Sequence, residues 1–252
     1  RTRGQSPRTI VLYMLVGAMQ LGIMYLLAFR AYLYLTVSEF LLFTVFTPLY
    51  ITLIYDLLSG RKLRWGYLLS AALAVLGAAI IRYDKVSDHF WTGLLLVQLS
   101  NLCFAIGMVG YKRLMEVRPM PQHNAFAWFY VGAFIVAVAA WFMLGNAQKL
   151  PTTTLQWSVL VWLGVVASGL GYFMWNYGAT QVDAGTLGIM NNVHVPAGLL
   201  VNLAIWQEQP HWPSFISGAL VILASLWVHR RWVAPHSGQT ADDRRRGSAQ
   251  SE

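Results

Sequence analysis

The feature that most constrains this chain is a series of eight apolar segments, each about 20 residues long, separated by short polar stretches. A helix of about 20 residues crosses the roughly 30 Å hydrocarbon core of a bilayer. A transmembrane β-barrel would instead show segments of about 10 residues with alternating polarity, and the sequence has no such alternation. We therefore predict an all-α, multi-pass membrane protein. The predicted spans are 10–29, 36–58, 66–82, 91–111, 124–144, 156–177, 185–206 and 213–232.

The composition supports this fold class and excludes several functions. The 252 residues are 57% hydrophobic and 11% charged, whereas soluble domains carry roughly a quarter charged residues. Cys103 is the only cysteine, so the chain can form no intramolecular disulfide and no thiolate cluster. The six histidines show no metal-ligand spacing. We expect no metal site and no cofactor.

The basic residues predict how the spans are oriented. Of the 18 lysines and arginines, 14 fall at one predicted end of the bundle and only Arg30, Arg82, Lys85 and Lys149 at the other. By the positive-inside rule the richer end is cytoplasmic, and so are both ends of this chain, including the polar tail 233–252. The same distribution argues against a nucleic-acid partner, because the cations are spread over four segments without a binding motif.

The chain also repeats itself at an offset of 147 residues. Glycine, tyrosine and tryptophan recur at this offset: Gly17 with Gly164, Gly22 with Gly169, Tyr25 with Tyr172, and Trp65 with Trp212. A three-helix unit, 10–82, therefore recurs as 156–232, and two further helices precede the second copy. A complete repeat would have five helices, which makes the two copies antiparallel in the membrane, as in secondary transporters with inverted repeats.

This repeat divides the chain into a first repeat at 1–82 and a second at 83–232. The first repeat lacks the two leading helices that the second one has. Because the sequence begins with Arg1 rather than Met, we expect a ten-helix parent of which about eight helices are present here.

The order of these features resembles the EamA family of the drug/metabolite transporter superfamily. The shared features are five helices per repeat, a glycine-rich helix, a mid-helix proline in the next helix, and a small-residue final helix, GALVILASLW. Stretches such as GYKRLMEVRPMPQHNAFAWFY and GYFMWNYGATQVDAGTLGIMNNVHVPAGLL are similar to enterobacterial inner-membrane members that take up biotin. The resemblance implies a secondary transporter in the bacterial inner membrane. Its expected solute is a small carboxylate, with biotin the solute implied, moved by alternating access.

The densest group of polar residues inside a span is the stretch NNVHVP in 185–206, with Asn191, Asn192 and His194. Polar groups in mid-membrane are costly and usually face a cavity or a partner helix. Pro196 removes the helical donor for the carbonyl of Asn192, as Pro48 does for Thr44. We expect these groups to bind a solute such as a ureido ring, which needs both donors and acceptors. The alternative is that they join helices.

Other spans contribute further candidates for a solute cavity. Each polar candidate could instead bond another helix, and each aromatic one could pack against lipid or core. The polar candidates are Gln20 and Asn101, the latter on one helix face with Gln98, and the aromatic ones, which would wall an apolar ring, are Tyr25, Tyr172 and Trp175.

Two charged residues flank the first predicted external loop. Arg30 could attract an incoming carboxylate, and Glu39 or His194 could carry a coupling proton. A structural ion pair between Arg30 and Glu39 is the alternative. The close spacing of Gly164, Ser168, Gly169 and Gly171 predicts tight helix packing.

The alternatives to an importer are an exporter of amino acids or related metabolites, a membrane scaffold protein, and an intramembrane enzyme. The chain has no HExxH, GxSxG or paired-aspartate motif, and Ser168 has no evident base, so we predict that it is not an enzyme.

Overall fold

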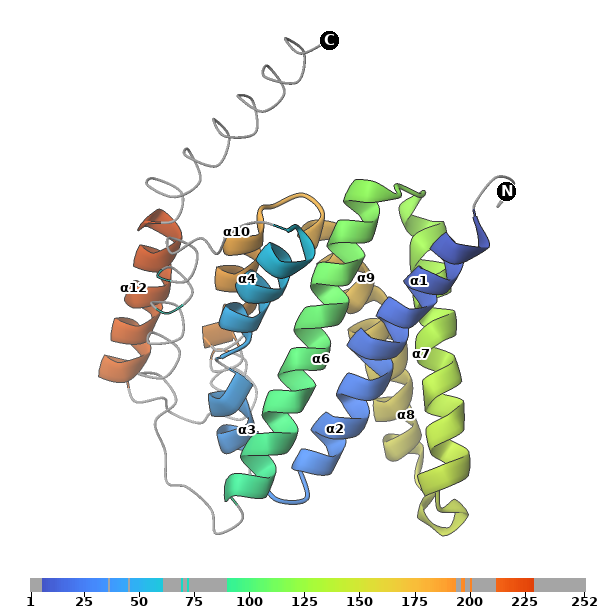
Figure 1. Cartoon of the computed structure of the whole chain (residues 1–252). Coiled ribbons are helices and arrows are strands. Elements are labelled where there is room, and N and C mark those ends of the chain that lie inside the picture. Colours follow the sequence, from blue (N-terminus) through green and yellow to red (C-terminus); the bar gives the residue numbers. More distant parts are fainter. Residues whose placement is uncertain are drawn as a thin grey trace. The chain divides into compact units, whose positions relative to one another are not determined.

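The computed structural model is helical throughout the residues that it describes, apart from turns and short connections (Figure 1). Contacts divide the chain into two compact units, each built from two separate parts of the sequence. The first unit is Arg1–Leu33 with Leu95–Val182, and the second is Tyr34–Leu94 with Asp183–Glu252. The described residues are 6–35, 37–44, 46–60, 69, 72, 90–193, 196, 197, 200 and 212–228.

The first unit holds four helices that are long and apolar enough to cross a membrane. They agree with the predicted spans 10–29, 91–111, 124–144 and 156–177. Two of the four are continuous helices with a stretch of π-helix in the middle. The elements are α1 (Pro7–Gly17), η1 (Ala18–Ile23) and α2 (Met24–Ala31), then α6 (Phe90–Val117), α7 (Gln122–Leu144), the short turn η2 (Ala147–Lys149), and α8 (Thr154–Trp162), η3 (Leu163–Gly171) and α9 (Tyr172–Ala179).

The starts of these helices follow from local sequence. Pro7 stands at the beginning of α1, where its fixed φ and missing N–H cost nothing. At α8, the Thr153 side chain accepts from the backbone N–H of Gln156, and the Gln156 side chain accepts from the backbone N–H of Thr153. This capping box satisfies two donors that would otherwise be unpaired at the helix start.

Reciprocal glycines pack helix 7–31 closely against α7. A Cβ added at Gly17 would overlap the backbone of Phe129, and one added at Gly132 would overlap the backbone of Met14. Small residues let two membrane helices approach until their backbones touch. Beside this crossing, Tyr13 joins a buried cluster whose other members are Tyr111, Met120, Ala125, Phe126 and Phe129.

The glycines of helix 154–179 behave differently, which corrects the sequence prediction. No atom of the described residues lies within 4 Å of a Cβ added at Gly164, and the nearest atoms to Gly169 and Gly171 belong to their own helix. In the described part of the chain these residues therefore make no tight crossing.

The second unit contains α3 (Val37–Thr44), α4 (Thr47–Leu58), α10 (Ala184–Asn191) and α12 (Trp212–Val228). The predicted single span 36–58 is thus broken into two helices around Phe46. Pro48 explains the break, because proline cannot donate a backbone hydrogen bond and clashes with the preceding turn. The predicted span 185–206 begins as expected, but α10 ends at Asn191. The predicted span 66–82 and the tail 233–252 lie outside the described residues, apart from Leu69 and Ala72.

The helix bounds reproduce the 147-residue repeat. The offset carries Val37–Thr44 onto Ala184–Asn191, which are the bounds of α10, and it carries η1 into η3. Repeat-related segments therefore share even a rare backbone feature, because a π-helix is uncommon and occurs mostly as short bulges. In the second unit α10 packs on α4, where a Cβ at Gly188 would contact Pro48.

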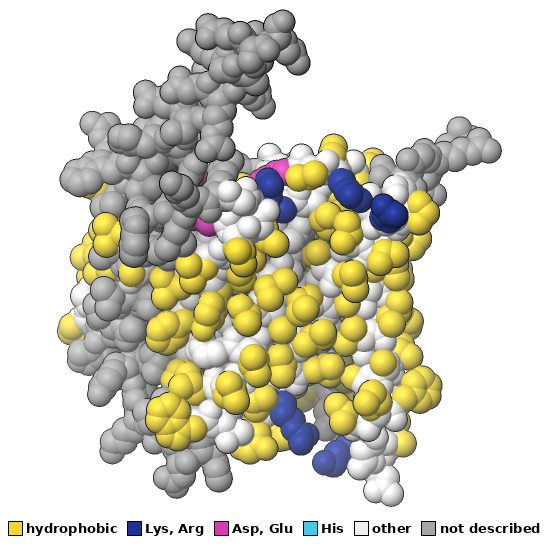
Figure 2. Space-filling model, in the orientation of Figure 1, with side chains coloured by type: hydrophobic (Ala, Val, Ile, Leu, Met, Phe, Trp, Pro, Cys, Tyr) yellow, Lys and Arg dark blue, Asp and Glu magenta, His cyan; other side chains and the backbone are white. Residues whose placement is uncertain are grey.

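The surface of the first unit suits a bilayer. Figure 2 shows hydrophobic side chains over the middle of the helices and basic ones near their ends. Arg118, directly after α6, donates to Thr9 in the first turn of α1, so Arg118 and Arg8 lie at the same end of the first unit, as predicted. Arg30 and Lys149 stand at the opposite ends of their helices.

Candidate functional site

The first unit contains an open pocket between helix 7–31, α7 and η3. Its volume is about 620 Å³ and it is mainly apolar. Its size is typical of small-molecule sites, which combine hydrophobic walls with a few polar groups. We call it the aromatic pocket. Its lining residues are Leu21, Gly22, Tyr25, Leu26, Phe29, Tyr130, Ala133, Phe134, Ala137, Ala140, Trp141, Leu144, Gly145, Gly164 and Ser168.

The repeat-related tyrosines meet beside this pocket. The ring centroids of Tyr25 and Tyr172 are 6.1 Å apart, with the planes tilted by 55°. The Tyr25 hydroxyl lies 3.3 Å from Oγ of Ser168, and Tyr172 makes an edge contact with Phe104 at 6.3 Å. Among the aromatic residues predicted to contact an apolar ring, Tyr25 lines the pocket, and the ring of Tyr172 packs against the ring of Tyr25.

Tyr130 fixes the backbone of the pocket's third wall. Its hydroxyl is 2.6 Å from the carbonyl oxygen of Ser168 and 2.5 Å from that of Gly169, and it donates to this pair. These carbonyls lie in η3, where the widened turn lengthens the usual helical bonding pattern. The sequence analysis did not single out Tyr130. Its only sequence signal was an aromatic residue within an apolar span, which is too common to be informative.

Gln20 lies in η1 and is fully buried. It packs against α6, where a Cβ at Gly107 would overlap Gln20. Neither amide atom of the side chain has a hydrogen-bond partner among the described residues. An unpaired amide in an apolar setting costs free energy. The alternative role of Gln20, a hydrogen bond to another helix, therefore has no support among the described contacts, and its role in a solute cavity stays a prediction.

The other candidates of the first unit lie along or against α6. Trp175 donates its indole N–H to the sulfur of Met108 at 2.9 Å, so its polar edge is occupied. Asn101 is buried within α6, and the neighbouring Ser100 donates to the carbonyl of Met24 at 3.0 Å. These bonds join α6 to both repeat-related helices.

In the second unit, Asn191 and Asn192 are buried at the end of α10, where the backbone N–H of Asn192 donates to Ile189. His194 lies outside the described residues. Pro48 provides no helical donor for the carbonyl of Thr44, and the Thr47 hydroxyl donates to this carbonyl instead, at 2.7 Å. A local side chain thus compensates for the N–H that Pro48 lacks.

The two charged candidates are only partly described. Arg30 is exposed in the last turn of α2, next to Phe29 of the aromatic pocket. Glu39 lies in α3, and its side chain is outside the description. The choice between an ion pair and a carboxylate-attracting Arg30 stays open.

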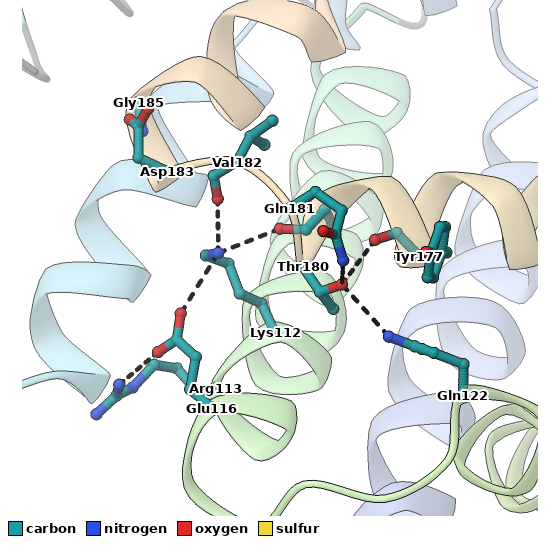
Figure 3. Close-up of polar contacts among 11 residues, drawn as sticks. Lys112, Arg113, Glu116, Gln122, Tyr177, Thr180, Gln181, Val182, Asp183 and Gly185 are labelled. Atoms are coloured by element: carbon teal, nitrogen blue, oxygen red, sulfur yellow. Dashed lines mark hydrogen bonds and ion pairs between the residues drawn. The ribbon is translucent and has the colours of Figure 1, made fainter.

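Sequence reasoning counted Lys112 among the cations that set orientation and did not foresee that it is buried. Lys112 is 5% exposed. Its ammonium donates to the carbonyl oxygens of Ala179 at 3.2 Å and Val182 at 2.6 Å, and it pairs with Glu116 at 3.3 Å. Figure 3 shows the side chain reaching from α6 to the turn after α9. Its four-residue spacing from Glu116 was the only sequence signal.

Comparison with known proteins gives two consistent results. Residues 91–230 match the EamA-like transporter family. Across its full length the chain is 82% identical to a protein of Escherichia coli (strain K12) called "Biotin transporter", covering 84% of that protein. It is 52% identical over 232 residues to a "Probable biotin transporter" of Pseudomonas aeruginosa, which covers 91% of this chain and 81% of that one.

A solved crystal structure supports the fold. It aligns with a TM-score of 0.67 at 17% sequence identity, covering 87% of this chain and 84% of the other. At this identity the similarity concerns the arrangement of the helices alone.

Proposed function

Because the chain belongs to the EamA-like transporter family, we propose that it is a secondary transporter that takes up biotin across the bacterial inner membrane by alternating access. The observation that carries the proposal is the 82% identity, over all 252 residues, with the Escherichia coli protein called "Biotin transporter". Both ends of the chain are cytoplasmic in this proposal, because the positive-inside rule assigns to the cytoplasm the predicted end that holds 14 of the 18 lysines and arginines.

The chemistry of the first unit suits part of such a solute. Biotin has an apolar ring, a ureido group and a carboxylate on an aliphatic chain. The aromatic pocket supplies an apolar wall through Tyr25 and Phe29, and Arg30 follows directly in the sequence as a cation for a carboxylate. Few polar groups line this pocket, so it favours the apolar and aliphatic parts of the solute over the ureido group.

In the second unit, the amides of Asn191 and Asn192 are our candidates for binding a ureido group, and in the first unit Gln20 is a separate candidate. Each amide offers a donor and an acceptor, and each of these residues is buried within its own unit. For Gln20 the assignment is supported by its amide having no other partner among the described residues. We retain His194 and Glu39 as candidates for proton coupling from the sequence alone.

The test is uptake of radiolabelled biotin by cells that lack their own biotin transport, with rates normalised to membrane-inserted protein. We expect saturable uptake that excess unlabelled biotin suppresses. Export of preloaded amino acids without biotin uptake would favour the exporter alternative. If the purified protein binds no solute and cells that contain it show no transport, the scaffold alternative is favoured.

The same assay tests the asparagines. Asn191→Leu and Asn192→Leu keep similar volume, and each lost hydrogen bond should weaken apparent affinity by about 0.5 to 1.5 kcal/mol. If both variants insert less well but keep the wild-type KM, these residues join helices and do not bind solute.

A further inference from the structure

Contacts between α6 and α9 form a regular ladder along two parallel helices. Phe104 contacts Tyr172, Met108 accepts from Trp175, and Lys112 donates to the carbonyl of Ala179. The three α6 residues are four apart and therefore lie on one helix face. Successive contacts are four residues apart on α6 and three or four residues apart on α9. Together they define one register of α9 along α6.

The three contacts differ in how strongly they define that register. The Phe104–Tyr172 contact is an edge contact between rings, which tolerates sliding. Thioether sulfur is a weak acceptor, so the bond from Trp175 to Met108 is also permissive. The Lys112 ammonium is different, because a buried charge without its acceptors is strongly unfavourable. A shift of α9 by one turn would remove the carbonyls of Ala179 and Val182 from its reach.

The position of Lys112 also suits the helix end electrostatically. The last carbonyls of a helix have no helical donors and carry the negative end of the helix dipole. Lys112 satisfies the carbonyl of Ala179, the last residue of α9, and that of Val182 in the following turn. Glu116 is a third acceptor at 3.3 Å, and it also pairs with Arg113.

A second, neutral contact holds the same turn from another helix. Gln122 at the start of α7 donates to the Thr180 hydroxyl at 3.3 Å, and its own carbonyl oxygen accepts from Tyr111 at 2.6 Å. Figure 3 shows Lys112 and Gln122 approaching the turn from two helices. The turn after α9 is thus bonded to side chains of both α6 and α7.

We propose that Lys112 is a positioning residue for transport: by bonding the C-terminal carbonyls of α9, it sets the register that places Tyr172 and Trp175. The role belongs to the carbonyl bonds, and the ion pair with Glu116 is secondary. The inference rests on the proposed function, because it assigns these aromatic residues to the solute site.

The first test measures biotin uptake by Lys112→Met and the matched control Glu116→Gln. Lys112→Met keeps an unbranched chain but removes the donor, and we expect its KM to rise about tenfold per inserted molecule. Glu116→Gln leaves both carbonyl bonds in place, so its KM should stay within about twofold of wild type, consistent with the small contribution of partly exposed ion pairs. An unchanged KM in Lys112→Met, with only less protein inserted, would show a purely structural role and overturn the proposal.

A double variant tests whether Lys112 acts through Trp175. If Lys112 acts through Trp175, the KM of the double variant Lys112→Met, Trp175→Phe should equal the higher of the two single-variant KM values. If the two residues act independently, the fold-increases in KM of the two single variants should multiply. If Lys112→Met inserts too poorly for kinetics, Lys112→Gln provides the test, because it keeps a polar side chain but is one atom shorter and carries no charge, so it should raise KM in the same direction. Wild-type KM in Lys112→Gln and multiplied effects in the double variant both contradict the proposal.

A measurement without solute separates this proposal from the proposed function. In a Cys103→Ser background, Met108→Cys and Trp175→Cys should be joined by a short bifunctional thiol reagent in membranes. We expect the yield to fall several-fold when Lys112→Met is added and to be unaffected by Glu116→Gln. Equal yields with and without Lys112→Met overturn the register role, whereas failure of wild-type biotin uptake alone overturns only the assigned solute.

Discussion

Helices 7–31 and 154–179 are related by the repeat, yet they are packed in opposite ways. Both carry a π-helical segment at the same offset. In the most apolar stretch of helix 7–31, 28% of the residues are buried by other described residues, against 0% in helix 154–179. Gly17 touches the backbone of α7, whereas its counterpart Gly164 has open space around the position of a Cβ. The repeat thus specifies the backbone of each helix, and the neighbouring helices determine what its glycines do.

Helix 154–179 is held by side-chain hydrogen bonds and ring contacts, whereas helix 7–31 combines side-chain hydrogen bonds with close glycine contacts. Tyr130 donates to the carbonyls of Ser168 and Gly169, and Lys112 donates to that of Ala179. Close glycine packing resists sliding along the whole crossing. Hydrogen bonds at a few points leave the rest of the helix face open, and that face forms the third wall of the aromatic pocket.

The largest effect should come from adding one methyl group at the two related glycines. In Gly17→Ala the Cβ overlaps backbone atoms of Phe129, which cannot move aside as a side chain would, so we expect destabilisation of at least about 1 to 3 kcal/mol. Gly164→Ala is the matched control and should be neutral or stabilising by up to about 1 kcal/mol, because alanine favours helix over glycine. Thermal unfolding of the purified variants measures both. Equal losses of stability in the two variants would contradict the proposed difference in packing.

The second prediction concerns Gln20, whose repeat counterpart is Ala167. Gln20→Leu keeps the volume and removes an amide without a partner among the described residues, so the unfolding temperature should stay the same or rise. Biotin uptake should fall about tenfold or more per inserted molecule, because a lost bond leaves a solute group buried and unpaired. Met19→Leu, in the same π-helical segment, should change neither quantity. Wild-type uptake by Gln20→Leu would remove Gln20 from the solute site.

The contrast between the two helices also shows what the sequence alone can predict. Apolar lengths located the four long spans of the first unit, because apolar length is a local property. The predicted ends lie within three residues of the observed ones, except that α6 continues to Val117, six residues beyond the predicted end at 111. The sequence analysis recognised that Pro48 removes a helical hydrogen bond. It did not predict that the Thr47 hydroxyl would donate to the Thr44 carbonyl in its place, because this bond depends on a side-chain rotamer. The tight packing predicted for Gly164 is not found among the described residues, since the same residue pattern suits both a helix crossing and an open wall.

For the candidate site, the sequence identified some of the residues that line it, but it did not predict which groups their side chains contact. Tyr25 and Tyr172 were identified through the repeat, and they do contact each other. Tyr130 and Lys112 were missed because their importance lies in backbone carbonyls distant in the sequence, 38 residues away for Ser168 and 70 for Val182. No periodicity or motif encodes such a bond.

Tyr130→Phe should have a moderate effect. The ring stays in the cluster with Phe126 and Phe129, while the carbonyls of Ser168 and Gly169 lose the hydrogen bond that they share from this hydroxyl. Because the Gly169 carbonyl also accepts from the backbone N–H of Tyr172, the cost should be about 0.5 to 1.5 kcal/mol. We expect a lower unfolding temperature together with a change in KM, because the wall of the aromatic pocket loosens. Phe134→Leu, on the same helix and lining the same pocket, is the control that changes the wall without touching η3. A normal unfolding temperature for Tyr130→Phe would show that η3 does not depend on this hydroxyl.

The smallest effect should come from Ser168→Ala, at the point where the two repeat-related helices share a hydrogen bond. The hydroxyls of Tyr25 and Ser168 are 3.3 Å apart, which is long for an O–H···O bond, so its loss should cost about 0.5 kcal/mol. The carbonyl of Ser168 keeps its donor from Tyr130, and the backbone of η3 should not move. Alanine also fits the open surroundings of this helix without strain. We therefore expect KM to change by less than about threefold, with the unfolding temperature unaltered. A loss as large as that of Tyr130→Phe would mean that the Ser168 side chain, and not its carbonyl, joins helix 154–179 to the rest of the unit.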